Sequence, residues 1–283
     1  MMPLSPLDVI FDPDCGVDLP LPEDLQKMYG RLQFPPAGAS PRVIGNFVTT
    51  LDGVVSLGIA GTTDGDAISG WSEHDSMVMG LLRSASDAVI VGAGTLRQSP
   101  NHIWTPEFVF PPMEAGYRAL RSALGKKEPP LTVIVSGGGA IDLSLPVFAG
   151  GRSPVLIITS ERGNTRIREN VVPPGVRVAP AGEGDTLSVR TILDVVERAL
   201  PGGALFLIEG GPRLIGQFFD AERLDELFLT LSPRLAGRDD RSRRPGLVSG
   251  RIFLPDRLVT GNLHGVRKSG SHLFLRYGFT RRV

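Results

Sequence analysis

The chain has 283 residues, of which 41% are apolar and 21% charged, as expected for one large folded domain or two small ones. Its 30 basic residues balance 30 acidic ones, so the sequence does not indicate a strongly basic nucleic-acid-binding protein. The single cysteine, Cys15, excludes an intrachain disulfide framework. No run reaches the roughly 20 apolar residues of a membrane-spanning helix, so we expect no membrane partner.

Residues 1–40 differ in composition from the rest of the chain. They contain many prolines and lead into the turn-rich segment FPPAGASP. We interpret them as an N-terminal arm with one short helix near residues 22–31, ahead of a single domain over residues 41–283. Residues 1–16 contain neither a basic segment nor a long apolar run, so we expect no secretory signal and a cytoplasmic location.

Beyond residue 40, short apolar runs rich in β-branched residues alternate with segments of helical periodicity. Several runs are continuously apolar, which is typical of strands buried on both faces of a mostly parallel sheet. The runs cover residues 42–50, 87–94, 131–139, 154–160, 175–180 and 204–211. The helical segments cover residues 72–85, 188–200 and 211–224. This alternation predicts an α/β fold.

The C-terminal part predicts a different arrangement. Residues 225–235 have the pattern of a strand, and residues 258–279 that of two strands joined by Ser269-Gly270, which favours a hairpin. Residues 238–251 are charged and contain glycine, so we interpret them as a surface loop. We therefore expect three layers, with a mostly parallel mixed sheet, helices on both faces and a C-terminal antiparallel hairpin.

The strongest ligand-binding pattern is EGGPRLIG at residues 209–216. A buried strand ends in Glu209, two glycines follow, and Pro212 suits the first turn of a helix. Backbone N–H groups at such a helix start form an anion site that fits a pyrophosphate. Glu209 would lie at the carboxyl end of a strand, where open α/β sheets hold ligands. The sequence has no P-loop, nucleophile elbow or zinc-ligand spacing, so we expect no metal.

Three further turns follow predicted strands. GAGTLR at residues 92–97 contains two glycines of a dinucleotide fingerprint, with Arg97 in place of the third. Asp52 lies in the turn TTLDG, and Ser136 precedes three glycines whose N–H groups could form an anion nest. Each turn lets a ligand approach the backbone closely.

Together, three segments resemble a known family. FVTTLDG, LLRSASDAVIVGAGTLRQ and LFLIEGGPRLIGQFFDAERLDELFLTLSPRLAG look like the reductase domain of bacterial bifunctional riboflavin-biosynthesis proteins, which has a dihydrofolate-reductase-like fold. The resemblance implies an NADPH-dependent oxidoreductase. Its substrate would be 5-amino-6-(5-phosphoribosylamino)uracil or the 2,5-diamino analogue, reduced to the ribitylamino compound by hydride transfer to ribose C1′.

The resemblance also implies roles for individual residues. Arg83 corresponds to an arginine that grips the substrate phosphate, and Glu209 would reach polar groups of the substrate. The residues that match cofactor-contacting positions are Val48, Thr95, Ser99, Ser136, Gly210, Gly211, Pro212, Arg213 and Leu214. Arg162 is one possible partner for the cofactor 2′-phosphate.

Asp52 is our candidate for polarising or protonating the substrate, directly or through water. A carboxyl buried beside an apolar strand would have a raised pKa. Fewer side chains are available to bind the substrate phosphate than is usual in the family, because residues 101–108 hold no second arginine and only His102 is available there.

Two alternative functions remain open from the sequence. A reductase of the same fold could act on a pterin or folate, with Asp52 assisting, and Arg83→Ala would then spare turnover. A protein that binds NADPH without turnover is the other alternative. We further expect a homodimer, in which the strand at residues 225–231 and the C-terminal hairpin extend a sheet edge to the partner.

Overall fold

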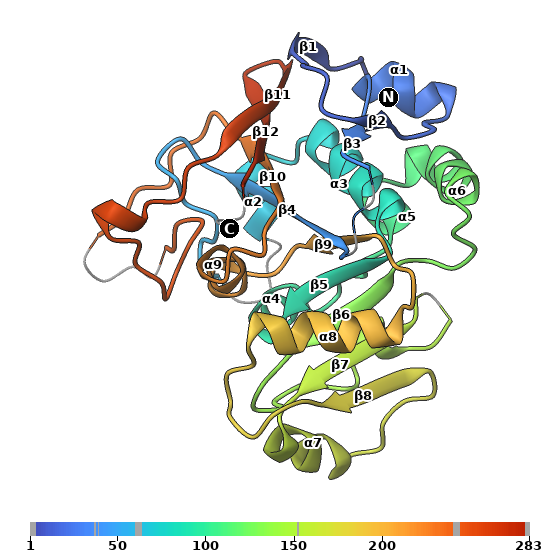
Figure 1. Ribbon diagram of the computed structural model, residues 1–283, viewed down its shortest axis with the longest axis vertical. Coiled ribbons are helices and arrows are strands. Elements are labelled where there is room, and N and C mark those ends of the chain that lie inside the picture. The colour runs from blue at the N-terminus through green and yellow to red at the C-terminus, as the bar shows by residue number, and fades with distance from the viewer. Residues whose placement is uncertain are drawn as a thin grey trace.

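The computed structural model describes residues 4–36, 38, 40–59, 64–151, 153–239 and 244–280. Their main feature is a ten-stranded sheet in the order β1-β11-β12-β10-β4-β9-β5-β6-β7-β8 (Figure 1). Its strands are β1 (Asp8–Phe11), β4 (Arg42–Thr49), β5 (Ala88–Gly92), β6 (Leu131–Val135), β7 (Val155–Thr159), β8 (Val176–Pro180), β9 (Leu205–Ile208), β10 (Glu226–Leu231), β11 (Asn262–Ser269) and β12 (His272–Gly278). A small antiparallel pair is formed by β2 (Val17–Asp18) and β3 (Gln33–Phe34).

Helices connect most of the parallel strands. They are α1 (Glu23–Tyr29), α2 (Asp64–Ser69), α3 (Glu73–Ala85), α4 (Ala93–Gln98), α5 (Pro106–Val109), α6 (Glu114–Ala123), α7 (Glu161–Arg168), α8 (Val189–Ala199) and α9 (Pro212–Asp220). Short 3₁₀ turns lie at Pro111–Met113, Pro146–Phe148 and Pro255–Arg257. Serines cap three of these helices, because the hydroxyls of Ser72, Ser160 and Ser188 each accept a hydrogen bond from an N–H of the first turn.

The predicted three-layer α/β fold is confirmed. The strands from β10 to β8 in the sheet order above run parallel, and their continuously apolar sequences alternate between two buried faces. In β5, Val89 packs in the core that includes α3 and α6, whereas Ile90 packs in the core that includes α8 and α9. Each face is therefore covered by helices (Figure 1), as a parallel sheet requires.

The N-terminal segment packs against this fold. The predicted short helix is confirmed as α1, and Leu25 and Tyr29 lie in the same core as α3. Strand β1 pairs with β11 and becomes the edge of the main sheet. The buried Arg267 of β11 donates hydrogen bonds to the carbonyls of Tyr29 and Arg31. These bonds tie the end of α1 and the residues after it to β11.

Two expectations for the C-terminal part need correction. The hairpin is confirmed, but its strands pair through Ser269 and His272, so Gly270 and Ser271 form the two-residue loop. Strand β10 lies between β12 and β4, and β11 lies between β1 and β12, so neither is a free edge. The described edges are β1 and β8, and assembly as a homodimer stays a prediction.

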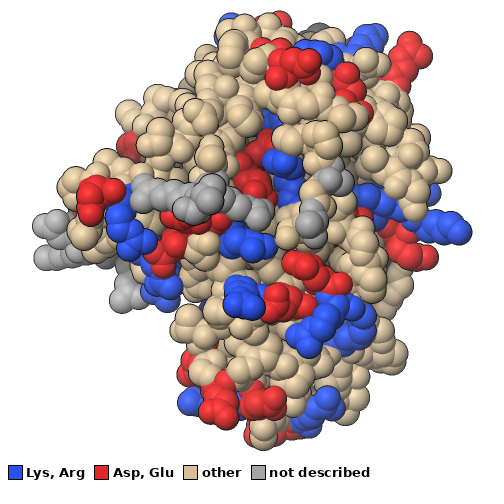
Figure 2. Space-filling model, in the orientation of Figure 1, with Lys and Arg blue, Asp and Glu red and all other residues tan. Residues whose placement is uncertain are grey.

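Charged side chains are spread over the surface. Figure 2 shows acidic and basic residues interspersed on one face, in agreement with the balanced composition. Among the described residues, none of the helices has the length and apolar character that crossing a bilayer requires.

Candidate active site

Three loops meet at the carboxyl ends of the central strands. β4, β9 and β5 are neighbours, and they end at Thr49, Ile208 and Gly92. The chain leaves β4 for β5 on one side and leaves β9 for β10 on the other, so the direction of winding changes here. In open α/β sheets such a switch point opens a crevice for ligands. The sequence-predicted turns at Asp52, Thr95 and Glu209 are thus brought to one edge.

The two glycine turns after β9 and β5 lie against each other. A Cβ on Gly211 would lie 3.4 Å from Thr95 Oγ1, and one on Gly210 would lie 3.2 Å from the Gly92 nitrogen. Gly211 is the N-cap of α9 and has no side chain to satisfy the helix start. No described residue accepts a hydrogen bond from the N–H of Gly210 or Gly211. The arrangement forms a cradle that suits an anion.

The other expected cofactor positions surround this edge. Val48 is buried in β4, and Thr95 and Ser99 lie at the start and end of α4, joined by a hydrogen bond of 2.9 Å from the Ser99 N–H to the Thr95 carbonyl. Arg213 is exposed in the first turn of α9, while Leu214 packs into the core.

The Ser136 turn is closed by the chain itself. Ser136 is buried, its carbonyl accepts from the Gly139 N–H, and a side chain on Gly137 would overlap the backbone of Asp185. Arg162 lies nearby on the surface, in a loose 3.7 Å ion pair with Asp185. Contact between this turn and a cofactor phosphate stays a prediction, and Arg162 is an exposed basic side chain beside it.

Arg83 and Glu209 form a buried ion pair. Arg83 Nε donates to both carboxylate oxygens of Glu209, at 3.2 and 3.0 Å, and its Nη2 donates to Oε2 at 2.7 Å. Nη1 donates to the carbonyls of Ile103 and Thr105, and Nη2 also lies 2.8 Å from His102 Nε2. All five guanidinium N–H groups thus face acceptors within the protein. Contact between Arg83 and a substrate phosphate stays a prediction, and it would require this pair to open.

The sequence left His102 as the available group for the substrate phosphate beside Arg83, but its side chain is not a cation in the structure. Its burial, and then the neighbouring Arg83 charge, lower the pKa of the imidazole to about 2. The ring is therefore neutral at working pH, and Nε2 accepts from Arg83. It packs against Trp104 and Phe108, with ring centroids 5.1 Å away in each case.

The expected burial and raised pKa of Asp52 are wrong. Its carboxylate accepts from the Thr50 hydroxyl at 2.5 Å and from the N–H groups of Ala236 and Gly237 at 3.1 and 2.8 Å. The Thr50 bond, followed by the backbone bonds, lowers the pKa of Asp52 to about 2. The sequence did not reveal this because residues 236–237 are distant in the chain and fold back over the TTLDG turn. Residues 240–243 of the predicted surface loop lie outside the described part of the chain.

Sequence reasoning missed Asp75, an acid buried near the same edge. It lies in the first turn of α3 and is 5% exposed. Burial raises its pKa to about 6, although a hydrogen bond from Thr230 opposes this, and the charges of Asp66 and Glu209 add to it. An acid in the first turn of a helix is usually an exposed dipole partner, so the pattern SEHD gave no reason to single it out.

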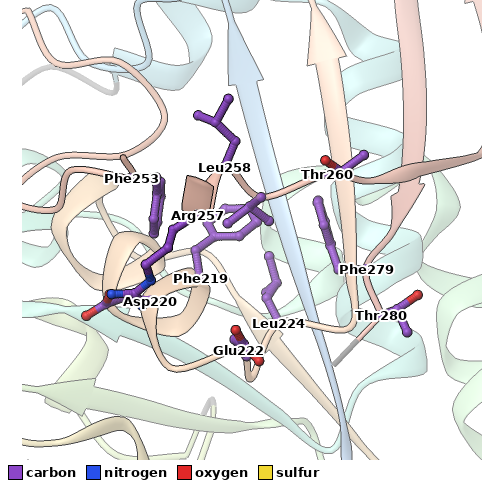
Figure 3. A pocket seen from close by; sticks show the side chains of 11 residues that line it. Phe219, Asp220, Glu222, Leu224, Phe253, Arg257, Leu258, Thr260, Phe279 and Thr280 are labelled. Carbon is purple, nitrogen blue, oxygen red and sulfur yellow. The ribbon is translucent and has the colours of Figure 1, made fainter. Parts of the chain in front are cut away.

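Two cavities among the described residues lie away from this edge. One, of about 150 Å³, lies beyond the C-terminal end of α9, where Phe219 lies between Phe253 and Phe279 in the view of Figure 3. A groove of about 950 Å³ lies at the opposite, amino-terminal edge of the strands, between residues 34–42 and 200–205. The described residues contain no cluster of three or more side chains suited to a metal ion.

Comparison with known proteins places these loops in a family. Residues 41–259, well over half of the chain, match the family described as the RibD C-terminal domain. A 2,5-diamino-6-ribosylamino-4(3H)-pyrimidinone 5′-phosphate reductase from Archaeoglobus fulgidus is 25% identical over 182 residues, which cover 64% of this chain and 76% of that protein.

Solved structures show the same fold. A pyrimidine reductase-like protein from Corynebacterium diphtheriae superposes with a TM-score of 0.66 at 22% identity, covering 91% of this chain and 99% of that one. The bifunctional deaminase/5-amino-6-(5-phosphoribosylamino)uracil reductase from Thermotoga maritima gives a TM-score of 0.62 at 20% identity, covering 85% of this chain. The chain spans 57% of that bifunctional protein. The protein described here belongs to the RibD C-terminal domain family, the reductase family that its strand-end loops resemble.

Proposed function

We propose that the protein is an NADPH-dependent pyrimidine reductase of riboflavin biosynthesis. Its substrate would be the 2,5-diamino-6-ribosylamino-pyrimidinone 5′-phosphate or the corresponding 5-amino-uracil, reduced at ribose C1′. The observation that carries the proposal is the cradle at Gly210 and Gly211, whose free N–H groups and missing side chains leave room for a pyrophosphate. Family membership and the name of the Archaeoglobus fulgidus relative support the reaction.

The residues present fit a nicotinamide dinucleotide. The start of α9 would hold the pyrophosphate through backbone N–H groups and the helix dipole. Val48, apolar and at the end of β4, would pack against the nicotinamide. When bound, NADPH supplies the hydride from nicotinamide C4. The chain orients the two reactants and excludes water, and neither task needs a protein nucleophile.

Arg83 and Glu209 would position the cofactor-binding loop rather than bind the substrate phosphate directly. Their ion pair links α3 to Glu209, the residue before Gly210. The N–H of Glu209 also donates to the Ile90 carbonyl of β5 at 3.1 Å. The ion pair therefore fixes the loop on which the cofactor rests. Arg162, exposed beside the Ser136 turn, is our candidate for the 2′-phosphate that distinguishes NADPH from NADH.

A second candidate, reduction of a pterin or folate, is favoured by one observation. The donors of Arg83 are occupied, and a pterin needs no phosphate-binding arginine. Dihydrofolate consumption, measured beside that of the two ribosylamino pyrimidines, separates the two functions.

The cradle is tested by thermal unfolding with NADPH and with NADH. A ligand that binds only the folded state stabilises it by about 2.7 kcal/mol at one hundred times its dissociation constant. We expect a clear rise in Tm with NADPH and a smaller one with NADH. Gly211→Ala should reduce the rise in Tm, because the new methyl group fills the path of the pyrophosphate. The variant should still fold, since φ at Gly211 is −64° and the methyl group meets Thr95 at an ordinary contact distance.

The matched control is Gly150→Ala, on an exposed turn whose Cβ would meet nothing closer than 3.7 Å. It should keep the full rise in Tm. If the wild-type protein shows no rise with either cofactor, or if Gly211→Ala responds as Gly150→Ala does, the cradle does not hold the cofactor.

A further inference from the structure

One segment after β10 runs along the candidate active-site edge, and its described residues belong to the range 234–249. Near its beginning, the Arg234 carbonyl accepts a hydrogen bond of 2.8 Å from the Leu51 N–H in the TTLDG turn. Near its end, the Ser249 N–H donates to the Pro212 carbonyl at 3.1 Å, in the first turn of α9. The segment therefore joins the TTLDG turn to the cradle.

Arg238 of this segment is fixed by backbone carbonyls. Its Nη1 donates to the Asp52 carbonyl at 3.0 Å, and its Nε donates to the Arg244 carbonyl at 2.9 Å. Its Nη2 lies beside two glycines, since a Cβ on Gly53 would be 3.8 Å from it and one on Gly246 3.6 Å from it. No described residue accepts a hydrogen bond from Nη2. One edge of the guanidinium thus faces a surface without side chains, which a ligand can approach closely.

Two further arginines of the segment are held in the same manner. Nη1 of Arg244 donates to the carbonyls of Ala236 and Gly237. Nη1 of Arg234 donates to the Ala67 carbonyl of α2 at 3.3 Å. A guanidinium has five N–H donors, so each of these side chains keeps donors to spare. Because the backbone already orders the side chains, a ligand would bind them at a lower entropic cost.

The positive charges of these arginines are not neutralised by neighbouring acids. Among the residues that the structure describes, none of the three forms an ion pair with a carboxylate, the nearby Asp52 and Asp239 included. The Asp52 carboxylate accepts from the Thr50 hydroxyl and from two backbone N–H groups instead. Positive charges gathered at one edge without acids attract an anion of more than one charge.

We propose that Arg234, Arg238 and Arg244 form a phosphate-binding site that takes the 5′-phosphate of the substrate. This assignment rests on the proposed function. A phosphate monoester carries about 1.5 to 2 negative charges at pH 7 and accepts paired hydrogen bonds from arginine. Arg83 does not compete for it, because its donors are directed to acceptors within the protein. The cradle is assigned to the cofactor pyrophosphate, which leaves the substrate phosphate for this cluster.

The test compares the phosphorylated substrate with its dephosphorylated form. The wild-type protein should have the higher kcat/KM for the phosphorylated form. Arg238→Gln should lower the ratio of the two kcat/KM values at least about tenfold, because one charge-assisted hydrogen bond to the phosphate is lost. A merely structural loosening of the segment would lower both values and leave their ratio in place.

The matched control is Arg257→Gln. Arg257 is exposed at the end of the 3₁₀ turn Pro255–Arg257, and its side chain makes no hydrogen bond or ion pair within the described part of the chain. It borders the small cavity beyond α9 and not the active-site edge. This variant removes the same charge and should leave the ratio of the two kcat/KM values unchanged.

Cofactor binding distinguishes the substrate phosphate from the phosphates of NADPH. The dissociation constant of NADPH, measured by fluorescence titration without substrate, should be the same for Arg238→Gln and for the wild-type protein. If Arg238→Gln weakens NADPH binding and keeps the ratio of the two kcat/KM values, the cluster serves the cofactor and the assignment to the substrate is overturned.

The remaining outcomes separate this assignment from the function on which it rests. If the wild-type protein reduces both forms equally well, or if Arg238→Gln keeps the ratio, the assignment is overturned and the reductase function stands. If the wild-type protein reduces neither form, the proposed function fails, and the assignment fails with it. Where Arg238→Gln does not fold, Arg234→Gln decides the question, since Arg234 is exposed and its side chain makes a single hydrogen bond of 3.3 Å. An unchanged ratio in that variant overturns the assignment.

Discussion

At the scale of single residues, the sequence did not predict the protonation of two carboxyl groups, Asp52 and Asp75. Asp52 stands in the most conspicuous turn, but three hydrogen bonds hold it as a carboxylate and tie it to residues 236–237. With a pKa of about 2 it has no proton to give at neutral pH. We expect Asp52→Asn to raise KM by loosening the 236–237 loop while the acid limb of the pH–rate profile stays in place. A displaced acid limb would restore Asp52 as the proton donor.

Asp75 should reveal itself in the pH dependence of stability. Its pKa in the folded protein is raised from 3.8 to about 6, so its contribution to folding is present below pH 4 and is lost as the pH rises through 6. The difference corresponds to about 3 kcal/mol, a figure that already includes the opposing effect of the bond from Thr230. Asp75→Asn should thus unfold at a higher temperature than the wild type at pH 8 and at a similar one near pH 4. If Asp75→Asn has a lower Tm than the wild type at pH 8, Asp75 is not buried without a compensating cation.

At the scale of elements, the ion pair of Arg83 and Glu209 joins α3 to the β9–α9 turn. Removing one partner of a buried pair typically costs about 3–5 kcal/mol, because the other charge is left unpaired. Arg83→Ala should therefore lower stability by about that amount and impair turnover of a pterin as well as of a phosphorylated pyrimidine. Replacing both partners by methionine should recover much of the stability in denaturant unfolding. A double variant no more stable than Arg83→Ala would show that the pair does not act as a unit.

The sequence predicts elements well where one pattern decides them. The continuous apolar runs of β5, β6, β7 and β9 and the periodicity of α8 need no distant partner to be recognised. Side-chain pairing is different, since Arg83 meets Glu209 across 126 residues and Asp52 meets Gly237 across 185. Residue types indicated which strand ends carry the candidate ligand loops, but the tertiary fold decides which charged groups are paired there.

At the scale of the whole molecule, the N-terminal segment is an integral part of the core. Leu25, Tyr29 and Leu32 are at most 3% exposed, and each contributes about 1.5–3 kcal/mol by burial. Their sum approaches the total stability of about 5–15 kcal/mol of a typical domain. Deleting residues 1–36 should therefore leave a chain without a cooperative thermal transition. A deletion variant that unfolds cooperatively near the wild-type Tm would show that residues 41–283 fold as an independent domain.

Transfer of deuterium from cofactor to product tests the central claim most directly. The protein is incubated with NADPH carrying two deuterium atoms at nicotinamide C4 and with 2,5-diamino-6-ribosylamino-pyrimidinone 5′-phosphate, and the product is analysed by mass spectrometry. The proposed hydride transfer to ribose C1′ predicts a ribitylamino product that carries one deuterium. A product without deuterium, or no product while the cofactor remains bound, would contradict a reductase working at the carboxyl edge of this sheet.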